Sequence, residues 1–194
     1  MQSKKENSKP RQGKKNSPPT PSGQASDEPE YVNYVLKLIC SPASMNMSVT
    51  KEDRSKYPIV TTEAYVPKTA FLAATATIKN TEYSFPKDFD VDYTFHEELN
   101  EETGNGFELI KEKLYFKNLP GHPTLIGLAE EKNSGVPSDW QPGQPPPSNY
   151  ENFGNFQLRG TGIFAKVEGE GIAMMGSSTG FVVYHVALIK GWPL

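Results

Sequence analysis

Phe181-Val-Val-Tyr-His-Val-Ala-Leu-Ile-Lys190 is a segment of mostly apolar and β-branched residues. Successive side chains of a β-strand point to opposite faces, so its odd-numbered and even-numbered residues belong to different sides. Both sides are apolar: one carries Phe181, Val183, His185, Ala187 and Ile189, and the other carries Val182, Tyr184, Val186 and Leu188. We therefore predict a strand buried on both faces, by a barrel interior, by an oligomer partner or by both.

The residues upstream of this segment alternate between short strands and glycine-rich turns. We predict strands at Phe156–Arg159 and around Glu170–Met175. Gly160-Thr161-Gly162 separates them, because glycine tolerates the positive φ that a tight reversal needs. Gly176–Gly180 is a second small turn, and it leads into Phe181–Lys190. Tyr150–Leu194 is thus predicted as a series of antiparallel strands.

This part of the chain resembles a known family. Tyr150-Glu151, the turn Gly160-Thr161-Gly162-Ile163-Phe164 and the closing Phe181 to Lys190-Gly191 are similar, in order and spacing, to the C-terminal end of plant allene oxide cyclases. The same glycine turn is similar to that of dirigent proteins, which share the barrel. The resemblance covers about the last quarter of the chain, from Tyr150 onward.

The resemblance implies an antiparallel eight-stranded β-barrel of calycin type. Members of the allene oxide cyclase family form trimers, bind no cofactor and close a reactive fatty-acid epoxide into a cyclopentenone. For this chain the resemblance therefore implies a homo-oligomer. It also implies a cofactor-independent isomerase or cyclase that acts on or binds a small hydrophobic, oxylipin- or polyketide-like ligand. The family places a catalytic Glu in its first strand, shortly before a Ser-Pro. Here Ser41-Pro42 follows Tyr31–Cys40, whose only charged residue is Lys37, so that carboxylate is absent.

The body of the chain is predicted to be all-β, because no segment keeps an apolar period of 3.6 residues. The predicted strands are Tyr31–Cys40, Ile59–Val66, Ala70–Ile78, Ser84–Leu99, Phe107–Leu119 and Thr124–Glu130. Ser84–Leu99 and Phe107–Leu119 form a hairpin around the turn Asn100–Gly106. Ser44–Pro58 is predicted as a polar connection, and the proline-rich Asn133–Asn149 as a long exposed loop. Many short strands with regular turns favour a barrel or a sandwich.

Ser84–Leu99 shows the clearest alternation in the sequence. Phe85, Phe89, Val91, Tyr93 and Phe95 share one face, and Asp88, Asp90, Asp92, Thr94, His96 and Glu98 share the other. This pattern predicts a half-buried strand with one wet face. His96 and Glu97 lie on opposite faces, so at most one of them enters a barrel.

Composition divides the 194 residues into a tail and one domain. Met1–Glu30 has no aromatic, Leu, Ile or Val residue, so residues 1–30 are predicted to be a disordered, basic, Pro- and Ser-rich tail, and residues 31–194 a barrel domain. No apolar run is long enough to span a bilayer, so we expect no membrane insertion. The single cysteine, Cys40, favours an intracellular, cytoplasmic setting. Organelle targeting by the tail is an open alternative.

Several apparent motifs fail in their context. Gly160-x-Gly162-x-x-Ala165 lacks the helix and βαβ unit of a dinucleotide site, and Gly176-Ser-Ser-Thr-Gly180 is followed by a strand rather than by the helix of a hydrolase elbow. Asp88-x-Asp90-x-Asp92 lacks the later ligands of a calcium loop. The three histidines and one cysteine have no zinc spacing. We accordingly predict neither a metal nor a cofactor.

The candidate ligand-binding residues are His185, Tyr93, Tyr115, Phe95 and Val183, and catalytic residues are left unassigned. His185 interrupts an apolar strand face. It is either a core histidine bonded to a neighbour or a polar handle in a ligand cavity, where desolvation would lower its pKa and keep it neutral. Tyr93 and Tyr115 lie on facing strands of one hairpin and could share that cavity, or they could be ordinary aromatic packing.

Two other functions fit the same sequence pattern. One is a non-enzymatic scaffold, with the barrel as a brace and the tail as a tether. The other is a small viral coat protein, in which a basic arm precedes a β jelly roll. The arm holds only six basic residues, which is few for packaging a genome, and this argues against nucleic acid as a partner.

Overall fold

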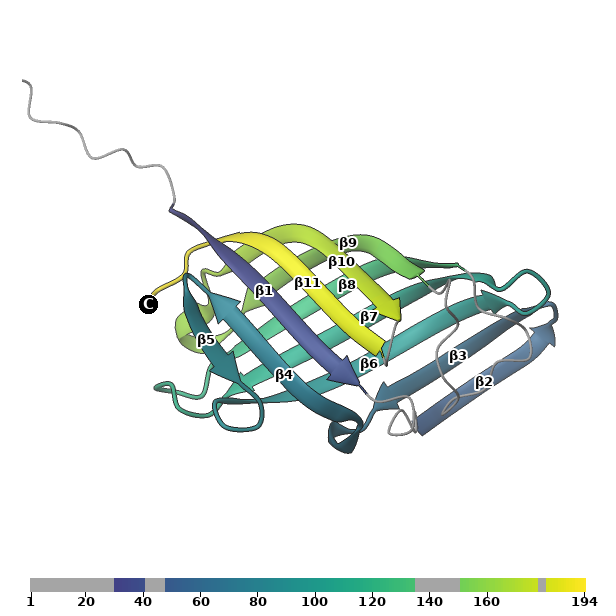
Figure 1. The fold of residues 1–194 in the computed structure, drawn as a ribbon, viewed down its shortest axis with the longest axis horizontal. Coiled ribbons are helices and arrows are strands. Elements are labelled where there is room, and N and C mark those ends of the chain that lie inside the picture. Colours follow the sequence, from purple (N-terminus) through teal and green to yellow (C-terminus); the bar gives the residue numbers. More distant parts are fainter. Residues whose placement is uncertain (1–29, 41–47, 135–150, 178–180) are drawn as a thin grey trace, which may run out of the picture.

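Eleven strands form one antiparallel sheet that curls into half of a barrel (Figure 1). This computed structural model describes residues 30–40, 48–134, 151–177 and 181–194. The predictions for the tail up to residue 29, for Ser41-Pro42, for the proline-rich segment 135–150 and for the turn residues 178–180 lie outside the described residues. The strands are β1 (Tyr31–Cys40), β2 (Ser48–Lys56), β3 (Ile59–Val66), β4 (Phe71–Ile78), β5 (Thr81–Ser84), β6 (Phe89–Asn100), β7 (Asn105–Phe116), β8 (Thr124–Ser134), β9 (Glu151–Gly160), β10 (Glu168–Ser177) and β11 (Phe181–Lys190). Short 3₁₀ turns lie at Lys68–Ala70 (η2) and Gly162–Phe164 (η3).

The strand order is β2-β3-β6-β7-β8-β9-β10-β11-β1-β4-β5. Strands β6 to β11 follow one another as an up-and-down meander, and each pairs with the next. An all-β, antiparallel, curled sheet is therefore confirmed. The prediction of eight strands closed into a barrel is wrong, because the described residues form eleven strands and β2 and β5 are the two ends of the strand order. The meander also differs from the jelly roll that the coat-protein alternative requires.

Most strands lie where the sequence pattern predicts them. Ile59–Val66 and Phe181–Lys190 match β3 and β11 residue for residue, and the predicted hairpin is β6 and β7. The polar connection predicted over Ser44–Pro58 is wrong, because its residues 48–56 form β2. This strand is exposed along almost its whole length and is held by its backbone pairing with β3, so it has no apolar period to detect. The predicted glycine turn is confirmed, with Gly162 at a φ of 61°.

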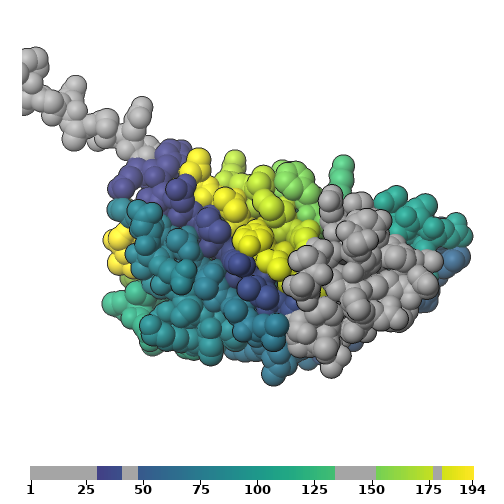
Figure 2. Space-filling view, in the orientation of Figure 1, coloured from purple at the N-terminus to yellow at the C-terminus, as the bar shows by residue number. Residues whose placement is uncertain are grey.

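Strand β11 is buried on its inner face only. Phe181, Val183, His185, Ala187 and Ile189 are all buried, as predicted. On the outer face Val182, Tyr184 and Val186 are half-buried and Leu188 is 56% exposed, so the described residues do not bury both faces of this strand. The outer surface of β1 and β11 lies open in Figure 2, in purple and yellow.

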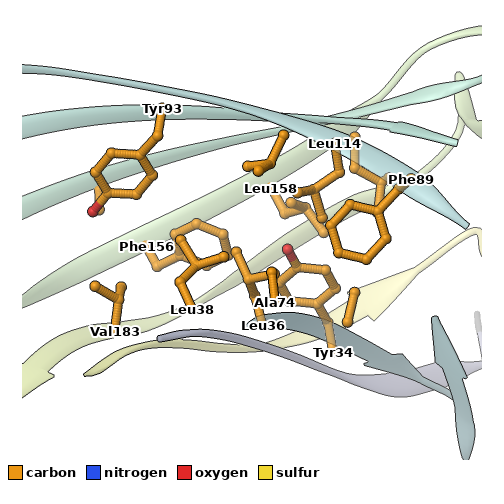
Figure 3. Close-up of a cluster of buried hydrophobic side chains, with 14 of the residues drawn as sticks. Tyr34, Leu36, Leu38, Ala74, Phe89, Tyr93, Leu114, Phe156, Leu158 and Val183 are labelled. Atoms are coloured by element: carbon orange, nitrogen blue, oxygen red, sulfur yellow. The ribbon is translucent and has the colours of Figure 1, made fainter. Parts of the chain in front are cut away.

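The core fills the hollow of the curled sheet. Tyr34, Leu36 and Leu38 of β1 point across it towards Phe89 and Tyr93 of β6 (Figure 3). One end of the hollow, which we call the aromatic end, is packed by Tyr83, Phe89, Phe116, Phe164 and Trp192. Its ring pairs are edge to face, tilted or stacked, with centroids between 4.5 and 5.8 Å apart, as is usual for packed aromatic side chains. No helix in the described parts of the chain has the length and apolar character needed to cross a membrane.

Candidate functional site

Polar side chains collect at the opposite end of the same hollow. We call this the acidic end, and it consists of Glu97, Glu108, Glu131, Asn133, Asn152 and His185. All are buried except Glu97, which is half-buried. Buried polar groups are rare unless they are paired or used, so this concentration is the feature of the core that needs explaining.

The strand register places these groups together. Glu97 of β6 is level with Glu108 of β7, and Glu108 is level with Glu131 of β8. The same row continues through two small residues, Gly154 and Ala173, to His185 of β11. Because the sheet curls and the two intervening residues are small, Glu131 and His185 meet across them: His185 Nε2 lies 3.6 Å from Glu131 Oε1.

Glu112 joins this end to the rest of the core. His185 Nδ1 lies 2.8 Å from Glu112 Oε2, and the Tyr34 hydroxyl donates to Glu112 Oε1 at 3.3 Å. The carboxylate has room because residue 127, level with it on β8, is glycine. A methyl group at Gly127 would run into both the Glu112 side chain and the Phe156 ring. That ring in turn lies against the imidazole, with centroids 4.7 Å apart.

The imidazole of His185 is held in its charged form. Burial by itself would lower its pKa, but the negative charge and hydrogen bond of Glu112, with the nearby negative charge of Glu131, outweigh burial and raise the pKa to about 9. The prediction of a neutral His185 is therefore wrong, because it considered desolvation without these carboxylates. Its prediction as a core histidine bonded to a neighbour is confirmed by the contact with Glu112.

Glu97 and Glu108 form a carboxyl pair bridged by amides. Asn133 Nδ2 donates to Glu97 Oε1 at 2.7 Å and to Glu108 Oε1 at 3.2 Å, while Asn152 Nδ2 donates to Glu108 Oε2 at 2.9 Å. Burial, and then the charges of Glu97 and Glu131, raise the pKa of Glu108 well above its usual range. Burial also raises the pKa of Glu97. The pair therefore retains a proton at a pH where exposed carboxyls have lost theirs.

Several buried atoms of the acidic end have no hydrogen-bond partner among the described residues. They are Glu131 Oε1, Glu131 Oε2, Asn133 Oδ1, Asn152 Oδ1 and His185 Nε2. Leaving such a group unsatisfied costs about 1–3 kcal/mol, and more when it is charged. Five such atoms in one place either lower the stability of the fold or indicate a position where another molecule binds.

The structure separates the five predicted site residues. His185, Tyr93 and Val183 face the interior and are buried, and Phe95 faces it and is half-buried. The placement of Tyr115 beside Tyr93 is wrong. Tyr93 is level with the inward-facing Glu112, whereas Tyr115 lies on the outer face, where its hydroxyl donates to Asp92 at 2.8 Å. The alternation of His96 and Glu97 is confirmed: Glu97 turns inward to Asn133, and His96 lies outside near Glu63 and Glu98.

Sequence reasoning missed the four glutamates that make the site. Glu97 continues the inward face of Phe89 to Phe95, and Glu108 and Glu112 continue the inward face of Leu114 and Phe116. The sequence therefore held an indication of their position, because these glutamates occupy the same alternate positions as the inward-facing apolar residues of each strand of the predicted hairpin. This indication was hidden because glutamates that alternate with apolar residues are the usual mark of a solvated face.

The arrangement supplies acid–base chemistry rather than metal or thiol chemistry. Among the described residues, no group of His, Cys, Asp or Glu has the geometry to hold a metal ion. The Cys40 thiol is buried, and burial raises its pKa to about 12. The acidic end instead places a protonated imidazole, the Glu131 carboxylate and a carboxyl pair with a retained proton around one apolar hollow.

Comparisons of this chain with protein-family models, curated proteins and solved structures return no match.

Proposed function

We propose that this chain binds a small, mostly apolar molecule inside the curled sheet and catalyses its isomerisation or cyclisation without a cofactor. The observation that carries the proposal is the set of five unpartnered buried atoms on Glu131, His185, Asn133 and Asn152. A core selected only for stability would replace such atoms with apolar ones, since removing both partners of a buried polar contact is often neutral or stabilising.

The groups at the acidic end suit a proton shift. Neither carboxylate oxygen of Glu131 has a hydrogen-bond partner among the described residues, so Glu131 is the candidate base. The proton retained between Glu97 and Glu108 is the candidate acid, and the His185 imidazolium, 3.6 Å from Glu131, can donate to a developing oxyanion. An isomerase neither adds nor removes atoms or electrons overall, so a base, an acid and a hydrogen-bond donor meet its needs.

Apolar walls surround these groups. Leu36, Leu38, Val183 and Ala173 are buried on β1, β11 and β10, next to His185. Ligand sites commonly combine such walls with a few placed polar groups, where the walls supply affinity and the polar groups supply orientation. Phe95 and Glu97 are only half-buried, so they are more exposed than the other inward-facing residues of the acidic end.

The resemblance to allene oxide cyclases supports the same reaction class, with one difference in the parts. The family's carboxylate belongs to the first strand, whereas the carboxylates here come from β6, β7 and β8. The oxylipin- or polyketide-like ligand and the trimer stay predictions of that resemblance.

The test is the conversion of an aliphatic β,γ-unsaturated ketone to its conjugated enone, followed by ultraviolet absorbance. This reaction requires only that one proton leave a carbon and another be returned. We expect wild type to accelerate it, and Glu131→Gln to lose at least 90% of the acceleration, since single general acid–base groups contribute about 10²–10⁴-fold. Tyr115→Phe, on the outer face of the same hairpin, is the matched control and should keep full activity.

A binding assay with the uncharged dye N-phenyl-1-naphthylamine accompanies this test. Dye binding without any acceleration of the ketone reaction would replace the isomerase by a non-catalytic binding barrel. Neither dye binding nor acceleration would favour the scaffold alternative.

A further inference from the structure

The unpartnered atoms of the acidic end are mainly hydrogen-bond acceptors. Four of the five are oxygens, namely both Glu131 carboxylate oxygens and the Oδ1 atoms of Asn133 and Asn152. The two amide nitrogens already donate to Glu97 and Glu108, which fixes the amide oxygens in their free orientation. A molecule that satisfies these oxygens must therefore bring N–H or O–H donors.

The charge around these oxygens is negative. Glu97, Glu108, Glu112 and Glu131 line this part of the hollow, and His185 is the one cationic side chain in the buried polar set of the described residues. His185 is already engaged by Glu112 at 2.8 Å. In a low-dielectric interior such an imbalance favours a cation and opposes an anion.

We propose that the acidic end binds the protonated primary amine of an amphiphilic ligand, through Glu131 Oε2 and the amide oxygens of Asn133 and Asn152, with the apolar part of that ligand along the core. Glu131 Oε1, on the side of His185, stays available as the base. This inference rests on the proposed function, because it names the head group that enters the same interior. The geometry suits it: an ammonium carries three donors, and the acceptors come from three buried side chains within one patch of β8 and β9.

The neighbouring contacts argue for an ammonium over other occupants. Asn133 and Asn152 are level with each other on β8 and β9, and Glu131 is two residues before Asn133 on the same inward face. A metal ion is disfavoured, because no described group of His, Cys, Asp or Glu has metal-binding geometry. A carboxylate head group would meet carboxylates instead of donors, apart from the single free nitrogen of His185.

The experiment compares three displacers of equal chain length. Decylamine, decanol and decanoate are titrated against bound N-phenyl-1-naphthylamine at pH 7, below their micelle-forming concentrations. We expect decylamine to displace the dye at a concentration at least about tenfold lower than either other compound, since a charge-assisted hydrogen bond is worth more than a neutral one. Glu131→Gln should reduce this preference about tenfold, whereas Asp92→Asn, a carboxylate on the outer face of β6, should leave it unchanged.

The head-group series on wild type tests the proposal without any variant. Decanoate or decanol displacing the dye as well as decylamine does would overturn the ammonium site. If the unsaturated ketone is still isomerised, that result leaves the proposed function standing. Dye that fails to bind to wild type would instead refute both, because the interior would then hold no apolar ligand.

Discussion

The two ends of the hollow are built on the same strands and differ in nearly everything else. At the aromatic end Phe89 of β6 is level with Phe116 of β7, and the rings of Phe116 and Phe164 meet edge to face. Eight residues along the same β6–β7 ladder, Glu97 is level with Glu108. The aromatic end buries apolar rings that pack against one another. The acidic end buries charged side chains and leaves five polar atoms without a hydrogen-bond partner among the described residues.

This difference indicates that one end of the sheet stabilises the fold and that the other serves binding and chemistry. Burial of apolar area contributes about 25 cal/mol per Å², so the aromatic end and the adjoining Leu36, Leu38 and Leu114 hold the fold. Buried ion pairs contribute little net stability, since desolvation offsets their attraction. The acidic end is therefore the part of the interior whose residue types are best explained by binding and chemistry.

The largest effect is expected where a ring is removed from the aromatic end. Phe116→Ala deletes a side chain that touches Tyr83, Phe89 and Phe164, and should lower the unfolding free energy by about 3–5 kcal/mol. Urea unfolding measures it. A loss below about 1 kcal/mol would show that this end does not carry the core.

The pH dependence of stability should expose the charge at the acidic end. His185 has a folded pKa of about 9, above its unfolded value of 6.5, so its contribution is complete below pH 6.5 and is lost as the pH rises through 9. The loss is on the order of 3 kcal/mol at about 1.4 kcal/mol per pKa unit. The raised pKa of Glu108 acts in the same direction, because its favoured protonated form is also lost on raising the pH.

The measurement is urea unfolding of wild type and His185→Phe between pH 6 and pH 10. The fall in wild-type stability over this range should be much smaller in the variant. If the unfolding free energies of the two proteins fall in parallel with pH, the conclusion that the His185 imidazole is charged is contradicted.

A smaller effect is expected where the two ends meet. Gly127→Ala places a methyl group against the Glu112 carboxylate and the Phe156 ring, and should cost about 1–3 kcal/mol through overpacking. Gly176→Ala is the matched control, because a Cβ there meets no atom within 4 Å, and it should change stability by less than about 0.5 kcal/mol. Equal effects of the two substitutions would argue against the tight placement of Glu112.

The smallest effect is expected outside the hollow. Tyr115→Phe removes only a hydroxyl that donates to the exposed Asp92, and it should change stability by less than about 0.5 kcal/mol. Dye binding should be unchanged. A loss of dye binding would show that Tyr115 belongs to the ligand site after all, contrary to its position on the outer face.

The sequence pattern could predict most of the strands, but not the edge strand β2 or whether the two edges of the sheet pair to close a barrel. Apolar alternation predicts β6, and a continuous apolar run predicts β11. By contrast, β2 pairs through its backbone and carries Lys51, Glu52 and Arg54 without any apolar period. Barrel closure depends on whether the two edge strands pair with each other, and no local pattern encodes that long-range contact.

The candidate site was predictable only in part, for a related reason. His185 was identifiable because a single polar residue interrupts an apolar strand face. Glu112 and Glu131 were not, since a glutamate on an alternating strand usually faces solvent and nothing local shows that the curl of the sheet encloses it. Their role becomes visible only in the register that brings Glu131 and His185 to 3.6 Å.

The most direct test of the functional account is urea unfolding of wild type and Glu131→Gln at pH 7, with and without decylamine. Without ligand, we predict that the two unfold with free energies within about 1 kcal/mol of each other, because the carboxylate serves binding rather than stability. Decylamine at a hundredfold excess over its wild-type dissociation constant should stabilise wild type by about 2.7 kcal/mol and the variant, which should bind it about tenfold more weakly, by only about 1.4 kcal/mol. A variant that is destabilised by about 3 kcal/mol or more, beside a wild type that decylamine does not stabilise, would show that Glu131 is a structural member of the core and would contradict the account.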